Sequence, residues 1–156
     1  MEKKRITVNF RFREKLNTVP GGKYHNYCYQ CSACVASCPA ARFSKNFNPR
    51  VILLQALLGM EEELLGKESP IWLCTNCYSC YERCPQDTRP IEVIIALKNM
   101  AVQKGTAPDA LAKLSENILK NGLSVTVTSA VNRIRHELGL PELKKIPLDE
   151  LKGILE

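Results

Sequence analysis

The sequence predicts a mainly α-helical protein with one short β segment at its N-terminus. Two observations predict this class: apolar residues recur at helical spacing over most of residues 48–138, and only one stretch alternates convincingly with a period of two. The chain has 156 residues, of which 45% are hydrophobic and 24% charged. This composition fits one compact domain with a hydrophobic core rather than a disordered chain.

The β segment is expected at residues 6–12. Its apolar side chains alternate with polar ones, as in a half-buried strand, and they are Ile6, Val8, Phe10 and Phe12. The best candidate for a second strand is residues 123–128, where the apolar residues are Leu123, Val125 and Val127. We expect the two segments to pair with each other, the alternative being that the first adds to the sheet of a partner protein.

Start and stop residues mark two helices in the middle of the chain. One begins at Asn48-Pro49, an N-cap residue followed by proline, and runs through to Leu65. It is apolar nearly all round, so we expect it to be central. The other begins near Pro90 and ends before Gly105.

Two further helices are expected after residue 105. The first runs from near Pro108 to Gly122, and the second stops at Gly139. The apolar face of the second consists of Val131, Ile134 and Leu138. We expect residues 148–155 to form a weak amphipathic helix or a tail.

The sequence gives no sign of a membrane span or a secretory signal. Its longest apolar stretch, residues 51–60, is ten residues long and contains Gln55, whereas a spanning helix needs about 20 apolar residues. The basic N-terminus leads into the alternating segment rather than into an apolar signal region. We therefore expect a cytoplasmic protein, in a reducing compartment where clustered cysteines more often bind metal than form disulfides.

The formal charge of +6 comes from the N-terminal part of the chain. Residues 1–48 carry nine Lys and Arg against two Asp and Glu, while residues 49–156 carry thirteen against fourteen. A solvated basic face explains this excess, and docking on an acidic partner or on nucleic acid are the alternatives. Nucleic-acid binding is disfavoured because the aromatic residues lie among the cysteines and residues 106–156 are charge-neutral, with seven charges of each sign.

The eight cysteines form two runs of identical spacing, and a proline follows each run. The first run consists of Cys28, Cys31, Cys34 and Cys38, followed by Pro39. The second run consists of Cys74, Cys77, Cys80 and Cys84, followed by Pro85. Each proline fits the first position of a departing helix, residues 39–43 in one case and Pro85 onward in the other.

This spacing predicts two 4Fe-4S clusters. Three cysteines two residues apart let one tight loop wrap a cluster corner, and in two-cluster ferredoxins of this spacing the fourth cysteine ligates the other cluster. The ligands expected for the first cluster are Cys28, Cys31, Cys34 and Cys84. Those expected for the second are Cys74, Cys77, Cys80 and Cys38.

Structural zinc and disulfides are the alternatives for these cysteines. Two separate C-x2-C pairs would suggest a zinc ribbon, but here the longer spacing occurs complete, twice, with both prolines. The chain contains no dinucleotide fingerprint and no phosphate-binding loop, and the clusters leave no cysteine over for nucleophilic chemistry. We therefore expect an electron relay between partner proteins, with no catalytic residues of its own.

Around the cysteine runs the sequence resembles the C subunit of heterodisulfide reductase. This is the small iron–sulfur subunit of the methanogen enzyme that reduces the mixed disulfide of coenzymes M and B. The resemblance covers about residues 24–141. Beyond the cysteines it includes Ile71–Cys74, Tyr78–Pro85, residues 91–100 and Glu137–Pro141.

The resemblance implies an α-helical ferredoxin fold that carries electrons through two 4Fe-4S clusters. The electrons would pass from a flavin-containing A subunit to a catalytic B subunit, with a hydrogenase or formate dehydrogenase as their source. We expect residues 1–20 to form a basic arm, 21–105 the two-cluster core, and 106–156 helices that pack on the core or on a partner. The alternative is the iron–sulfur subunit of another respiratory or heterodisulfide-reductase-like dehydrogenase complex.

Several other residues near the cysteines are candidates for a functional role. The aromatic residues expected to shield the clusters from water are Tyr24, Tyr27, Tyr29, Trp72, Tyr78 and Tyr81. The arginines close in sequence to the thiolates are Arg42, Arg83 and Arg89. These three are either ordinary solvated or helix-terminal charges or groups that tune the clusters. His25 and His136 have no companions at ligand spacing, so we expect both to be structural or surface residues.

Overall fold

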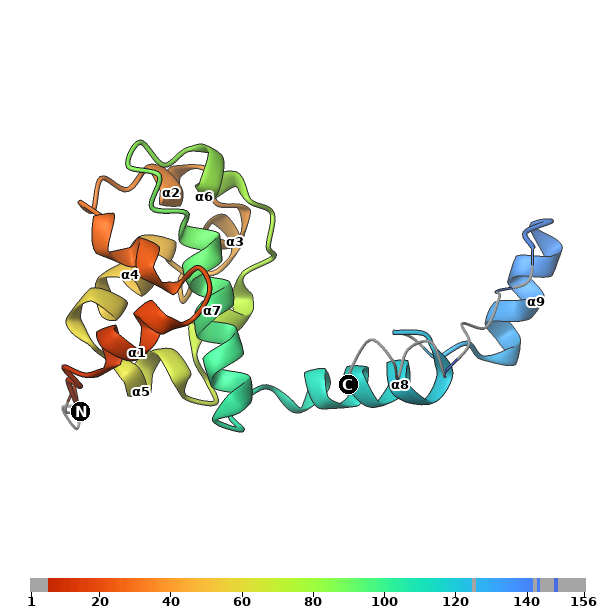
Figure 1. Ribbon diagram of the computed structural model, residues 1–156. Helices are drawn as coiled ribbons and strands as arrows, with labels where there is room; N and C mark the ends of the chain where they lie inside the picture. Colours follow the sequence, from red (N-terminus) through yellow and green to blue (C-terminus); the bar gives the residue numbers. More distant parts are fainter. Residues whose placement is uncertain (1–5, 125, 142, 144–147, 149–156) are drawn as a thin grey trace, which may run out of the picture. The chain divides into compact units, whose positions relative to one another are not determined.

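The computed structural model describes residues 6–124, 126–141, 143 and 148, and every regular element among them is helical. This confirms the mainly α class (Figure 1). The α-helices are α1 (Phe12–Thr18), α2 (Ala33–Ala36), α3 (Pro39–Phe43), α4 (Pro49–Leu58), α5 (Glu61–Leu65), α6 (Ser79–Glu82), α7 (Pro90–Gln103), α8 (Asp109–Asn121) and α9 (Ser129–Glu137). Two short 3-10 helices, η1 (Gly22–Tyr27) and η2 (Pro70–Leu73), lie before the first cysteine of each run.

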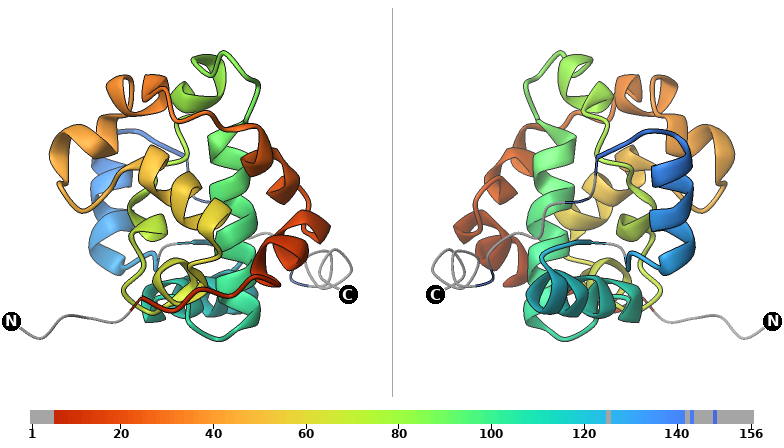
Figure 2. Two further views of the ribbon diagram at one scale, coloured as in Figure 1. Left: turned by 90° about the vertical axis from the view of Figure 1, so that its left-hand side faces the viewer. Right: turned by 90° about the vertical axis from the view of Figure 1, so that its right-hand side faces the viewer.

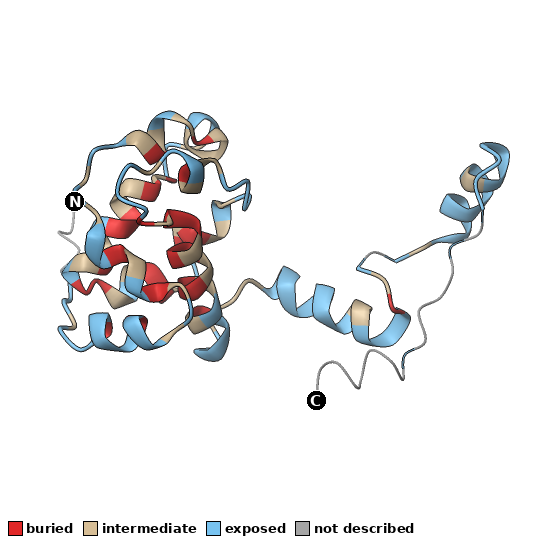
Figure 3. Cartoon of the chain, turned by 45° about the horizontal axis from the view of Figure 1, so that its top comes forward, coloured by how far each residue is buried: buried red, intermediate tan, exposed pale blue. Residues whose placement is uncertain are grey.

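The chain divides into two compact units, Met1–Ala107 and Pro108–Glu156. The first unit contains both cysteine runs and nearly all of the buried side chains (Figure 3). In the described part of the second unit, neither α8 nor α9 contains a buried residue. No helix in the described part of the chain is long and apolar enough to cross a membrane.

Two long helices form the centre of the first unit. Helix α4 buries Ile52 and Leu53, and α7 buries Ile94 and Leu97, all in one hydrophobic core. Figure 2 shows α7 between the N-terminal helices α1 and η1 and the segment that contains α4 and α5. The prediction that the helix beginning at Pro49 is central is therefore confirmed.

The caps explain where these helices begin and end. Asn48 Oδ1 accepts a hydrogen bond from Val51 N–H at 3.2 Å, so the predicted N-cap is present. Helix α7 begins at Pro90 and ends before Gly105, as predicted. The helix predicted over residues 49–65 is, however, two helices, because Gly59 has a left-handed φ of +73°. A Cβ at Gly59 would lie 2.4 Å from Asn9 O, so only glycine fits this corner.

The prediction of an N-terminal β segment is wrong, because no strand occurs in the described residues. Residues 6–9 have no regular structure, and α1 begins at Phe12. The expected partner, residues 123–128, is also not a strand, although Val125 lies outside the described residues. A strand without a partner leaves its N–H and C=O groups unpaired, whereas helix formation satisfies them internally.

Helix α1 instead contributes to the core. Phe12 and Leu16, four residues apart on one face, are both fully buried. The segment before α1 is held against the end of α4 by Asn9, whose N–H donates to Gly59 O at 2.8 Å. The period-two pattern of residues 6–12 therefore ends in the first buried position of a helix.

The second unit follows the predicted boundaries closely. Helix α8 spans Asp109–Asn121 and is followed by Gly122 with a φ of +69°. Helix α9 begins after Thr128, whose Oγ1 accepts from Val131 N–H at 3.4 Å. The predicted C-terminal helix or tail lies outside the described residues, except for Leu148.

Replacing Leu16 with alanine tests the place of α1 in the core. The side chain is 0% exposed, and replacements of this kind cost about 2–5 kcal/mol. We expect the thermal midpoint of the cluster-loaded protein, measured by circular dichroism without oxygen, to fall by on the order of 10 °C. Leu58→Ala makes the same change at a position that is 52% exposed and should have a much smaller effect. Equal midpoints for the two variants would contradict a core position for α1.

Candidate metal centres

The two cysteine runs are built in the same way. A 3-10 helix precedes each run, a short α-helix holds its third cysteine, and these short helices, α2 and α6, contact each other at one end of the first unit (Figure 1). The first cysteines are capped identically: Cys28 N–H donates to His25 O, and Cys74 N–H donates to Ile71 O, both at 3.2 Å. The repeat in spacing is therefore also a repeat in structure.

Both loops contain left-handed residues that are not glycine. They flank the second cysteine of each run, with φ values of +64° at Gln30, +71° at Ser32, +53° at Asn76 and +61° at Tyr78. Such conformations are uncommon for residues with a Cβ, and they cluster at functional sites. Their recurrence at equivalent positions indicates that the loop shape is required twice.

Each cavity among the cysteines is lined by four of them. The first is lined by Cys28, Cys31, Cys34 and Cys84. The second is lined by Cys38, Cys74, Cys77 and Cys80. Each cavity has about 310 Å³ of space unoccupied by protein atoms. In both, three cysteines come from one run and the fourth comes from the other run.

The cysteines differ in burial according to their position in the run. Cys34, Cys38 and Cys80 are each 8% exposed, whereas Cys31 and Cys77 are exposed. Cys34 and Cys80 belong to different cavities but pack in one apolar cluster with Ile91. The two cavities therefore approach each other at this cluster, and each also has an exposed edge.

The buried thiols are poor anions by themselves. Burial, with a smaller contribution from the neighbouring cysteines, raises the pKa of Cys34 to about 11 and that of Cys80 to about 12. At the exposed edge, a hydrogen bond with Ser79 Oγ, 3.5 Å from Cys77 Sγ, lowers the pKa of Cys77. Cys34 and Cys80 need a positive partner such as iron to act as thiolates at neutral pH.

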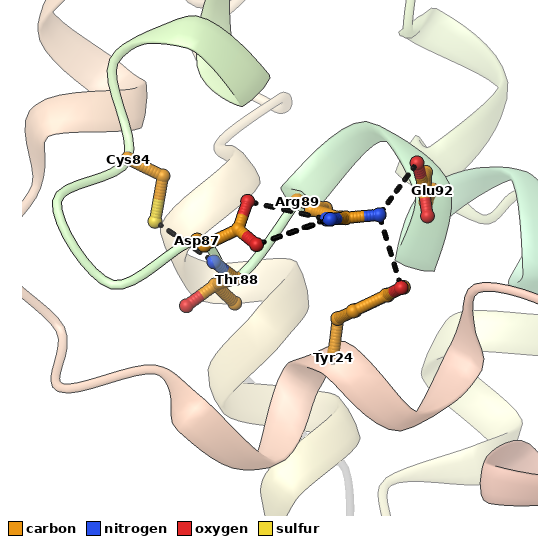
Figure 4. Close-up of polar contacts among 6 residues, drawn as sticks. All are labelled: Tyr24, Cys84, Asp87, Thr88, Arg89 and Glu92. Carbon is orange, nitrogen blue, oxygen red and sulfur yellow. Dashed lines mark hydrogen bonds and ion pairs between the residues drawn. The ribbon is translucent and has the colours of Figure 1, made fainter.

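The first cavity also offers hydrogen-bond donors. Thr88 N–H donates to Cys84 Sγ at 3.3 Å (Figure 4). Gln30 Nε2 donates to Cys28 Sγ at 3.3 Å. Thr88 lines the cavity, and its buried Oγ1 has no hydrogen-bond partner among the described residues. Buried polar atoms are normally paired, so this hydroxyl is free for a bound group. Four thiols and these donors fit an anionic cluster.

No group of three or more His, Cys, Asp or Glu side chains in the described residues could hold a single metal ion. This does not conflict with a cluster, because each iron of a cubane takes one cysteine and the four thiolates surround eight atoms rather than one.

The prolines after the runs behave differently. Pro39 occupies the first turn of α3, as predicted. No helix begins at Pro85, where the prediction is wrong: a turn follows it, and α7 starts only at Pro90. The reason is the backbone of Asp87 and Arg89, each left-handed with a φ of +48°, which no α-helix can include.

The aromatic residues near the cysteines are only partly buried. Tyr24 and Trp72 pack against the main core, and Tyr81 packs against the cluster of Cys34, Cys80 and Ile91. The remaining three are largely exposed: Tyr27, Tyr29 and Tyr78. Shielding by aromatic packing is thus limited to the first three.

The other polar residues divide between surface and interior. Arg42 and Arg83 line an open groove beside Cys77. His25 is fully buried, its Nδ1 donates to Gly22 O at 2.6 Å, and burial lowers its pKa. Arg89 donates to Tyr24, which lies 65 residues away in the sequence, and forms ion pairs with its neighbours Asp87 and Glu92. The sequence pattern does not reveal that role, because it depends on which residues the fold brings together.

Comparisons with known proteins agree with this geometry. A family model described as a 4Fe-4S dicluster domain matches residues 24–88. The chain is 40% identical over 114 residues to the CoB–CoM heterodisulfide reductase iron–sulfur C 2 subunit of Methanocaldococcus jannaschii, covering 73% of this chain and 60% of that protein. It is 35% identical over 135 residues to the C subunit of ferredoxin:CoB–CoM heterodisulfide reductase of Methanosarcina mazei, covering 83% and 82%.

A third relative is the C2 subunit of the H2/formate:CoB–CoM heterodisulfide,ferredoxin reductase of Methanococcus maripaludis. It is 37% identical over 133 residues, which cover 81% of this chain and 71% of that protein. The match spans only about three fifths of the Methanocaldococcus jannaschii protein and of a relative from Methanopyrus kandleri. With two 4Fe-4S clusters as its cofactors, the chain belongs to the family of iron–sulfur C subunits of heterodisulfide reductase.

Proposed function

We propose that this protein is the electron-transfer subunit of a cytoplasmic heterodisulfide reductase. It carries electrons from a flavin-containing subunit to a catalytic subunit that reduces the disulfide of coenzymes M and B. The observation that carries the proposal is the pair of four-cysteine cavities that approach each other in the interior. The names of the relatives supply the reaction.

The proposed ligands follow the lining of the cavities. The first cluster takes Cys28, Cys31, Cys34 and Cys84. The second takes Cys38, Cys74, Cys77 and Cys80. Each bound cluster supplies a one-electron centre whose potential depends on hydrogen bonds to sulfur, nearby charge and solvent exposure.

The two loops hold their clusters with backbone as well as side chains. Successive right-handed and left-handed residues gather N–H groups into a concavity that favours anions, an arrangement found at iron–sulfur sites. A cubane with four thiolates carries roughly two negative charges when oxidised. The left-handed Ser32 and Tyr78 therefore serve the clusters rather than the core.

The burial pattern defines a path for electrons. Cys31 and Cys77 provide the exposed edges at which partner centres approach, and Cys34 and Cys80 pack together in the dry interior beside Ile91. The protein's contribution is to fix this separation and adjust the two potentials.

The partners are assigned by the same reasoning. The proposed partners are a separate flavin-containing A subunit and a catalytic B subunit, with a hydrogenase or formate dehydrogenase as the source of electrons; the lack of a flavin fingerprint in this chain is consistent with them. Residues 21–105 form the proposed two-cluster core. The basic N-terminal residues and residues 106–156 are left for contacts with these partners or with the core.

Replacing Cys84 with alanine tests the crossed ligation. We expect the cluster-loaded variant to keep about four of eight irons per chain, because only one of two cubanes loses a ligand. Paramagnetic resonance should lack the signal that Cys31→Ala also removes and retain the signal that Cys77→Ala removes. Cys38→Ala is the matched control and should give the reverse pattern. Loss of the Cys77-dependent signal in Cys84→Ala would show that each run holds its own cluster.

Replacing Ser32 tests the loop conformation. Valine is β-branched and therefore tolerates a φ of +71° less well than serine does, so we expect Ser32→Val to bind the first cluster weakly and to lose part of its iron on dilution. Glycine adopts this φ without strain, so Ser32→Gly should keep the full iron content. Equal iron content in both variants would mean that the left-handed conformation is not required.

Affinity purification without oxygen tests the proposed role in a complex. We expect the tagged chain to bring down a flavoprotein and a catalytic protein rich in paired cysteines, and the mixture to reduce the heterodisulfide. The readout is mass spectrometry of the bound proteins together with thiol release. A partner set consisting of a dehydrogenase flavoprotein and a quinone-binding membrane protein would assign the chain to another respiratory complex.

A further inference from the structure

Arg89 connects the segment after the second cysteine run with η1, which precedes the first run, beside the first cavity (Figure 4). Its Nη1 donates to Tyr24 Oη at 3.0 Å, and its guanidinium lies 4.5 Å from the centre of the Tyr24 ring. Its Nε and Nη2 donate to the carboxylate of Asp87 at 3.1–3.2 Å, and Glu92 Oε1 lies 3.8 Å from Nη1. Tyr24 belongs to η1, which leads into the first cysteine loop, while Arg89 follows the last cysteine of the second.

These contacts fix the backbone around Thr88. Asp87 and Arg89 both have a φ of +48°, an unfavourable conformation for residues with a Cβ. Thr88 lies between them, is 1% exposed, and donates its N–H to Cys84 Sγ at 3.3 Å. The paired hydrogen bonds from the Arg89 guanidinium to the Asp87 carboxylate stabilise the backbone of residues 87–89. The hydrogen bond from Arg89 to Tyr24 holds this segment against η1.

The second cavity has no counterpart to this arrangement in the described residues. The runs are offset by 46 residues (28 to 74), so the position equivalent to Arg89 is Phe43. Phe43 is 95% exposed, and no N–H donor to Cys38 Sγ is found in the described part of the chain. The arrangement therefore serves the first cavity alone.

We propose that Arg89 is a positioning residue for the cluster that Cys84 ligates, because it keeps the Thr88 N–H on Cys84 Sγ. A donor to a ligating sulfur stabilises the extra negative charge of the reduced cluster, so this bond raises the reduction potential of that cluster. It also holds Cys84 in place, so it slows loss of iron. The inference rests on the proposed ligation by Cys84.

The test uses the full, cluster-loaded chain in redox titrations followed by paramagnetic resonance. Arg89→Gln removes the paired hydrogen bonds to Asp87 and should shift the Cys84-dependent signal to a more negative potential while leaving the other signal unchanged. Arg89→Lys keeps the charge but loses the planar guanidinium, so it should shift the same signal in the same direction. Arg11→Gln is the matched control, because it removes the same charge from an exposed side chain that lines neither cavity, and it should leave both potentials unchanged.

Iron retention gives a second readout. With a chelator, Arg89→Gln should lose half of its iron about fivefold faster than the parent protein, the factor expected for one hydrogen bond. Tyr24→Phe keeps the ring but removes the oxygen that accepts from Arg89, and it should cause a smaller negative shift of the same signal. This milder variant keeps the inference testable if Arg89→Gln loads only one cluster.

Three results would overturn the inference: unchanged potentials in Arg89→Gln and Tyr24→Phe, equal shifts of both signals, or a parent-like potential in Arg89→Lys. A parent-like potential in Arg89→Lys would show that the positive charge of Arg89, and not the position of the Thr88 N–H, sets the potential. The Cys84-dependent signal is defined by Cys84→Ala and the first-loop signal by Cys31→Ala. If Arg89→Gln shifts the Cys84-dependent signal but Cys31→Ala removes the other one, the crossed ligation is wrong and the role of Arg89 stands.

Discussion

Each four-cysteine cavity is completed by a cysteine from the other cysteine run. The arrangement of the helices in the first unit depends largely on this constraint. Cys84 must return to the loop of Cys28–Cys34, and Cys38 must reach the loop of Cys74–Cys80. The two loops therefore lie side by side, with α2 against α6. Closing such long loops costs conformational entropy, which burial of apolar side chains on α4 and α7 offsets.

The loops of the two cysteine runs have the same backbone conformation but different surroundings. The left-handed residues recur at equivalent positions, and so do the caps that begin each run. Thr88 and Gln30 donate hydrogen bonds to cysteine sulfurs of the first cavity. In the second cavity Ser79 lies beside Cys77, and Phe47, Ile91 and Ile94 add an apolar lining. Two sites of one ligand type can in this way hold electrons with different affinity, as directional transfer requires.

The sequence predicts those features whose signals are local. Asn48 and Gly122 act through neighbouring backbone groups, so the helix boundaries there are correct, whereas the expected strand over residues 6–12 is wrong because a strand depends on a distant partner. At the site, cysteine spacing indicates the cluster type, and the two cavities contain the same two sets of cysteines that the spacing predicts, although ligation itself stays a proposal. The position of Arg89 is invisible in the sequence because its acceptor, Tyr24, lies 65 residues away.

The shared cavities also impose an order on biosynthesis. A nascent chain that has not yet emerged beyond residue 73 contains only one of the two cysteine loops, so it can offer a complete ligand set to neither cluster. Once Cys80 has emerged, the second set is complete, and the first awaits Cys84. With the ligands proposed above, neither cluster can be completed before Cys80 has emerged, so a fragment released before that point would hold neither.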